Sequence, residues 1–73
     1  MKTLTEKQEF IFDCIKDFIK ENEYSPSIRE LCEIANLKSP ASVFSHLVKL
    51  RDKGYITYVD GKNRTIRIIK EVE

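Results

Sequence analysis

The chain has 73 residues, of which 41% are hydrophobic and 34% are charged, and its formal net charge is +1. This length has room for one hydrophobic core, so we expect a single domain over residues 1–73, with little space for a buried catalytic pocket. No apolar run approaches the ~20 residues that cross a bilayer, and the first residues lack the apolar segment of a secretion signal, so the sequence predicts a cytoplasmic protein.

The first predicted helix spans about residues 5–21. It begins at Thr5, because Thr5 and Gln8 have the spacing of a capping box, in which each side chain bonds a backbone amide at the helix start. Apolar residues then recur at the helical period and define one buried face, which two further aromatic residues widen. The face consists of Ile11, Cys14, Ile15, Phe18 and Ile19, with Phe10 and Phe12 beside them.

A second, short helix is predicted at about residues 28–35. Pro26 disfavours helical angles in the residue before it, and Ser27 and Glu30 form another capping box. Asn36 follows the last apolar residue of the pattern. Asn tolerates the left-handed backbone conformation that ends many helices, so we expect the helix to stop there.

The third helix is predicted at about residues 40–53, after a turn of only a few residues. Ser39 suits the N-cap, and Pro40 suits the first helical position, because the amide that proline lacks would have no partner there. Gly54 suits the left-handed cap at the other end. The predicted core stripe is Val43, Leu47 and Leu50.

From Tyr55 onward the apolar pattern changes from the helical period to alternation. Residues 55–59 and 65–69 are rich in β-branched and aromatic side chains, and the segment between them contains Gly61. They predict a β-hairpin at about residues 55–69. The order of helix, helix, tight turn, helix and hairpin predicts a mainly α fold with a small β-hairpin, a three-helix winged helix-turn-helix domain.

Charge is distributed unevenly along the chain. Residues 1–37 have a net charge of −3, and residues 38–70 have a net charge of +6. This asymmetry favours a basic face that meets a polyanion, although a chance imbalance on a solvated surface stays an alternative. Cys14 and Cys32 lie in apolar helical patterns, so we expect reduced core thiols. His46 has no companion ligands, and we predict no metal site and no cofactor.

Six motifs resemble the N-terminal DNA-binding domain of LexA-type repressors and cover nearly the whole chain. They are Leu4-Thr5-x-x-Gln8, Tyr24-x-Pro26-Ser27-x-Arg29-Glu30-Leu31, Leu37-Lys38-Ser39-Pro40, Ser42-Val43-x-x-His46-Leu47-x-x-Leu50, Lys53-Gly54-Tyr55-Ile56 and Arg64-x-Ile66-Arg67. The resemblance implies a winged domain whose third helix reads operator DNA, in a repressor of the SOS response. In that family a C-terminal domain, outside these residues, brings dimerisation and self-cleavage. The chain is therefore expected to be one domain of a longer repressor or a stand-alone relative.

The chain departs from the family pattern at two turns. Glu23 stands where the family usually has Gly before Tyr24, and Ile34-Ala35-Asn36 replaces the usual Ala-Leu-Gly. The exposed positions of the third helix are also untypical, so the resemblance does not supply an operator sequence.

The candidate DNA-contacting residues form two sets. The first faces away from the core stripe near the start of the third helix, where we expect base contacts; it comprises Ser39, Ala41, Ser42, Phe44 and Ser45. The second is basic and lies at the turn, the end of the third helix and the hairpin, where we expect phosphate contacts; it comprises Lys38, Lys49, Arg51, Lys53, Lys62, Arg64 and Arg67. No nucleophile, paired acid or Gly-rich phosphate loop accompanies them, so we do not expect an enzyme.

Several of these assignments have alternatives. Ser42 either contacts a base or makes a second local cap bond, and Ser39 serves as cap and phosphate ligand together. Phe44 either meets a thymine methyl or packs against the hairpin or the first helix. The expected partner is double-stranded DNA with a two-fold operator, bound by a chain that is monomeric alone and paired on DNA or through a further domain. The alternative function is a winged-helix module that docks a protein through Phe44.

Overall fold

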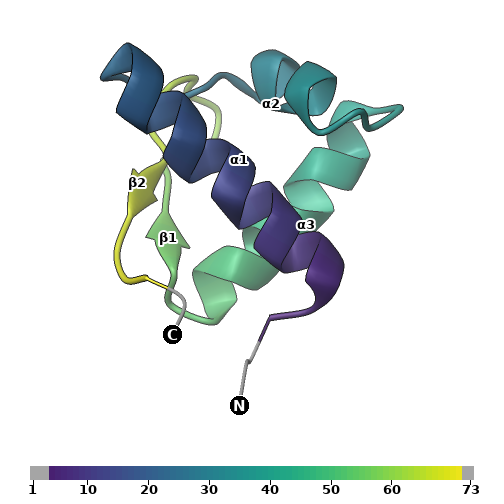
Figure 1. Ribbon diagram of the computed structural model, residues 1–73. Coiled ribbons are helices and arrows are strands. Elements are labelled where there is room, and N and C mark those ends of the chain that lie inside the picture. Colours follow the sequence, from purple (N-terminus) through teal and green to yellow (C-terminus); the bar gives the residue numbers. More distant parts are fainter. Residues whose placement is uncertain (1–3, 72–73) are drawn as a thin grey trace.

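The computed structural model describes residues 4–71, which form three helices followed by a two-stranded antiparallel hairpin. The helices are α1 (Glu6–Asn22), α2 (Ile28–Ile34) and α3 (Pro40–Asp52), and the strands are β1 (Ile56–Thr57) and β2 (Arg67–Ile68). Figure 1 shows α1 crossing in front of α3, with α2 at the top and the hairpin at one side. The predicted three-helix winged helix-turn-helix fold is confirmed, and each helix begins and ends within one residue of its expected position.

Both predicted capping boxes are present. Thr5 Oγ1 accepts the backbone amide of Gln8 at 3.1 Å, and Gln8 Oε1 accepts the amide of Thr5 at 3.2 Å. Ser27 and Glu30 make the same reciprocal pair at the start of α2, at 3.1 and 2.9 Å. Each box satisfies two amides that would otherwise have no partner inside the helix, which fixes where α1 and α2 begin.

Residues in the left-handed backbone region follow each helix. Their φ angles are 63° at Glu23, 56° at Asn36 and 84° at Gly54. Asn and Gly adopt this region readily, so the predicted ends of α2 and α3 are confirmed. Glu23 occupies it with a full side chain, at a cost of about 1–2 kcal/mol that the Gly expected here from the family resemblance would avoid.

One hydrophobic core connects all five elements. Phe12 of α1 is fully buried and meets Tyr55, just before β1, edge to face with ring centroids 5.6 Å apart. This contact packs α1 directly against the start of the hairpin. The buried apolar residues are Leu4, Ile11, Phe12, Ile15, Leu31, Ala35, Val43, Leu47, Leu50, Tyr55, Ile56 and Ile66.

Five residues that the sequence placed in the core are less buried than expected. Phe18 and Ile19, near the end of α1, are half-buried. Phe10 is 46% exposed and lies beside acidic side chains on the outer face of α1. Cys14 and Cys32 are free thiols, as expected, but both are only half-buried. Partial burial, with the nearby charges of Asp17 and Asp13, raises the pKa of the Cys14 thiol.

The hairpin ladder is much shorter than the sequence predicts. β1 and β2 pair over two residues each, with Ile56 opposite Ile68, whereas strands were expected over residues 55–59 and 65–69.

Side chains explain why the ladder stops, because they bond the backbone groups that longer strands would pair. Thr65 Oγ1 accepts the amide of Val59 at 2.9 Å, and Ser25 Oγ accepts the amide of Ile66 at 3.1 Å. Arg64, with φ of 60°, also turns the chain out of the extended conformation before β2.

Phe12→Ala should lower the free energy of unfolding by about 3–5 kcal/mol, because it removes a fully buried ring from the core that all elements share. Phe10→Ala is the matched control in the same helix; its ring is 46% exposed, and the change should cost less than about 1 kcal/mol. Urea denaturation followed by circular dichroism measures both values. Equal losses would contradict the assigned core.

Candidate nucleic-acid interface

The first half of α3 presents small and aromatic side chains to solvent. Ala41 and Ser45 are exposed, Phe44 is 40% exposed, and Ser39 and Ser42 are half-buried. The opposite face of the same helix is fully buried through Val43, Leu47 and Leu50. The structure therefore brings the five expected base-contacting residues together, on the open face of α3 or at its start.

Ser39 and Ser42 contact each other at the start of α3. Ser39 Oγ accepts the backbone amide of Ser42, and the two hydroxyl oxygens lie 3.4 Å apart. The N-cap expected at Ser39 is confirmed, and the local bond considered for Ser42 is also present. Because these distances are at the long end of the hydrogen-bond range, both hydroxyls can turn to another partner at little cost.

Phe44 packs against the hairpin with part of its ring. It meets Tyr58 edge to face, with centroids 6.4 Å apart and an interplanar angle of 67°. Arg51 lies over the same Tyr58 ring, with Cζ 4.8 Å from its centroid. These contacts join α3 to the hairpin while leaving much of Phe44 accessible. Tyr58 was not selected from the sequence, because no local pattern distinguishes it from the other aromatic residues of the hairpin.

A hollow of about 200 Å³ lies between α3 and the turn of the hairpin. Phe44 and Leu47 line it from α3, and Tyr58 and Val59 line it from the hairpin, with Lys62 also in its wall. The helix and the hairpin are therefore two sides of one concave, mainly apolar surface next to basic side chains.

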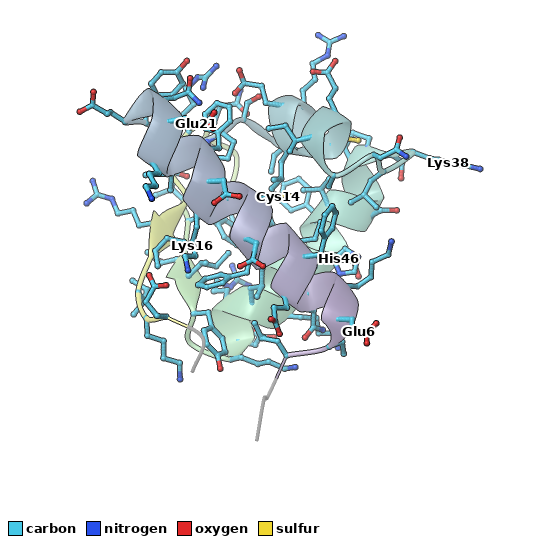
Figure 2. All side chains as sticks on the ribbon, in the orientation of Figure 1. Glu6, Cys14, Lys16, Glu21, Lys38 and His46 are labelled. Carbon is cyan, nitrogen blue, oxygen red and sulfur yellow. The ribbon has the colours of Figure 1, made fainter. Side chains whose placement is uncertain are left out.

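Four of the seven expected phosphate-contacting residues are exposed cations without a side-chain hydrogen bond or ion pair in the described residues 4–71. They are Lys38, Lys49, Lys62 and Arg67. Figure 2 shows the Lys38 side chain projecting from the turn between α2 and α3, away from the body of the protein. These four charges are available to an anionic partner.

The other three basic residues have partners within the protein. Arg51 covers an aromatic ring of the hairpin. Lys53 Nζ donates to Gln8 Oε1 at 2.8 Å, which connects the end of α3 to the start of α1. Arg64 forms an ion pair with Glu30, with Nη1 and Oε1 2.9 Å apart. Gln8 and Glu30 lie 45 and 34 residues from Lys53 and Arg64, so the sequence could not separate these two residues from the four available cations. Arg51 meets Tyr58 and Asp60, which are close in sequence, but only the folded hairpin places them against it.

Glu30 has two structural roles at once. Its carboxylate closes the capping box with Ser27 and also accepts Arg64 Nη2 at 3.1 Å. The hydrogen bond from the Ser27 amide, followed by that from Arg64, lowers the pKa of Glu30 from its ordinary value of 4.5. The first role is visible in the sequence, whereas the second depends on where the fold places the hairpin.

The described residues 4–71 contain neither a metal-ligand cluster nor a helix that could span a membrane. No group of three or more His, Cys, Asp or Glu residues is placed to hold a metal ion, and His46 is half-buried. No helix within that part of the chain has the length and apolar character needed to cross a membrane.

Comparison with known proteins gives a family match and a set of relatives. The family model described as "LexA DNA binding domain" matches residues 1–65. The "Transcription regulator LexA" of Synechocystis sp. is 44% identical over 97% of this chain, and the "LexA repressor" of Caldicellulosiruptor saccharolyticus is 47% identical over 96% of it. The "LexA repressor" of Thermosipho melanesiensis is 42% identical over the whole chain. The chain covers only 35–36% of the length of these relatives.

Glu30→Gln should reduce the loss of stability in acid. Because folding lowers the pKa of Glu30, its contribution to stability is present above 4.5 and is lost as the pH falls below that value. Gln keeps the capping box but does not titrate. The melting temperature of the variant should therefore fall less than that of the wild type between about pH 5 and about pH 3.

The exposed carboxyl of Glu33 in the same helix provides the control. Glu33→Gln should follow the wild-type acid profile. A Glu30→Gln profile that also matches the wild type would contradict a role for the Glu30 carboxylate in stability.

Proposed function

The chain belongs to the LexA DNA-binding domain family, and from this premise we propose that it binds double-stranded DNA sequence-specifically as the operator-reading part of a transcriptional repressor. The observation that supports the proposal most directly is the family match over residues 1–65, which includes all of α3. The open face of that helix, beside a hairpin and exposed cations, has the side chains that such a function needs.

In this proposal the N-terminal part of α3 enters the major groove. The helix has 13 residues, which makes it about 20 Å long, and the major groove is wide enough to admit a helix. Base contacts come from Ser39, Ala41, Ser42, Phe44 and Ser45. The small side chains allow close approach, and the serine hydroxyls can donate to or accept from either kind of base, so each adds only weak specificity.

Phosphate contacts come first from the exposed cations without intramolecular partners. Lys38 precedes α3, Lys49 lies in its last turn, and Lys62 and Arg67 lie on the hairpin. Arg51 and Lys53 add positive charge nearby, but each would have to share its present partner. These contacts set affinity and register, and they do not distinguish sequences.

The repressor would act on paired half-sites in the cytoplasm, at the nucleoid, and prevent transcription by occupying the operator of genes of the SOS type. We infer that the chain alone is monomeric, because the buried faces of all three helices meet in one core. Pairing would then occur on the DNA or through a further domain of a longer repressor.

Selection of binding sites from a random duplex library tests the proposed function. We expect enrichment of a two-fold symmetric sequence with a constant half-site spacing, bound by two chains per duplex. Sedimentation of the free chain should show a monomer at micromolar concentration. Absence of any enriched sequence would contradict operator binding, and a tight free dimer would contradict pairing on the DNA.

The accessible part of Phe44, next to a mainly apolar hollow, favours one other function, docking of a protein partner. The dependence of binding on salt separates the two functions. Binding to DNA releases counterions from the phosphates, and this gain shrinks as the salt concentration rises, so affinity for DNA falls steeply with salt. Apolar docking is nearly insensitive to salt.

Phe44→Ala should weaken operator binding with little loss of stability. The ring is 40% exposed and packs on Tyr58 with one edge, so its removal should cost about 1 kcal/mol of unfolding free energy. If the ring meets a thymine methyl, discrimination for thymine at one position per half-site should also fall by about 1 kcal/mol. Urea denaturation and binding to single-base operator variants measure the two effects. Unchanged base preference would assign Phe44 to packing alone.

A further inference from the structure

We propose that Arg64 is a positioning residue, which fixes the hairpin against α2 and the loop before it and does not itself contact DNA. This inference rests on the proposed function and changes the role expected for Arg64 from the sequence. It depends on the contacts of the Arg64 side chain and on how the hairpin is otherwise held.

The Arg64 side chain is 43% exposed, and all its partners come from one region of the fold. Nη1 donates to the backbone oxygen of Ser25 at 3.1 Å and lies 2.9 Å from Glu30 Oε1, and Nη2 donates to Glu30 Oε2 at 3.1 Å. The guanidinium also lies over the ring of Tyr24, with Cζ 4.8 Å from the centroid. We call these four residues the Arg64 clamp.

The clamp holds the side of the hairpin that leads into β2, whereas the contacts from α3 reach the other side, through Tyr58 and Asp60. The ladder of the hairpin has only two residue pairs, and Arg64 lies between the turn and β2. Two residues further on, Ile66 is buried, and its amide donates to Ser25 Oγ, so the backbone and side chain of Ser25 both hold this segment. The clamp therefore fixes this side of the hairpin against α2 and the loop before it, and the contacts from α3 fix the other side.

The backbone conformation of Arg64 also indicates a structural role for its side chain. Its φ of 60° lies in the left-handed region, which a glycine would occupy without strain. The contacts of the Arg64 side chain offset the free energy that its left-handed backbone conformation costs. The carboxylate of Glu30 also neutralises the guanidinium and occupies donors on both of its terminal nitrogens, which weakens its attraction for a phosphate.

Salt titrations of DNA binding separate positioning from phosphate contact. Lys62→Ala removes an exposed cation without a described partner and should lower the slope of log affinity against log salt by about one unit or less. Arg64→Ala should lower affinity about fivefold at every salt concentration and leave the slope unchanged. Arg64→Lys retains the charge but not the bidentate geometry, so it should not restore affinity.

Arg64→Gly relieves the left-handed backbone and should bind DNA as Arg64→Ala does. It is therefore a second variant in which loss of the clamp is separated from backbone strain. A slope that falls with Arg64→Ala, or affinity restored by Arg64→Lys, would overturn the proposal.

The DNA affinity of Glu30→Gln distinguishes the two roles of Arg64, phosphate contact and positioning of the hairpin. If Arg64 contacts a phosphate, removing the neighbouring negative charge should raise affinity or leave it unchanged. If Arg64 positions the hairpin, Glu30→Gln should lower affinity, and it should add little further loss in the Arg64→Ala background. Higher or unchanged affinity for Glu30→Gln would overturn the proposal.

Amide hydrogen exchange tests the clamp without DNA. Arg64→Ala and Glu30→Gln should each speed exchange of the Ile66 amide about fivefold, because both loosen the segment that Ser25 holds. Lys62→Ala should leave this rate unchanged. Wild-type exchange rates in both clamp variants would overturn the proposal. Failure of the wild-type chain to bind any duplex would instead contradict the proposed function, while the exchange rates still decide whether Arg64 fixes the hairpin.

Discussion

The packing of Phe12 on Tyr55 is the contact on which the arrangement of the other elements depends. It joins the middle of α1 to the residue that leads from α3 into the hairpin, and both rings belong to a core with members from every helix and from the hairpin. A chain of this size has no second core to compensate for a loss. The same core buries Val43, Leu47 and Leu50 of α3, and this burial leaves the opposite face of the helix, which we propose for DNA, open to solvent.

Hydrogen bonds and ion pairs of polar side chains fix the helix ends and the side of the hairpin that lie outside the core. Lys53 bonds Gln8 across the ends of α3 and α1, and Arg64 bonds Glu30 between the hairpin and α2. A basic side chain that holds the fold in this way has less capacity to neutralise phosphate. The seven basic residues considered above therefore divide into those with partners inside the fold and those without one among the described residues 4–71, and net charge alone does not reveal the division.

Phe44 connects the open face of α3 with the hairpin. Contact with Tyr58 limits the positions of its ring, and 40% exposure leaves surface for a partner. A partly packed aromatic residue loses less conformational freedom on binding than a freely rotating one. The two readings of Phe44 offered by the sequence, packing on the hairpin and contact with a base, are therefore compatible in one side chain.

The sequence by itself determined the helices, because their signals act over three or four residues: Thr5 with Gln8, Ser27 with Glu30, and the apolar period between caps. It also identified the open residues of α3, since they follow from the position of the buried stripe. Only the tertiary structure decided the length of the hairpin and the partner of Arg64. Thr65 and Ser25 bond backbone groups that local propensity assigned to strands. Arg64 and Glu30 are 34 residues apart, and no local pattern specifies a contact that forms only once the core has placed the hairpin beside α2.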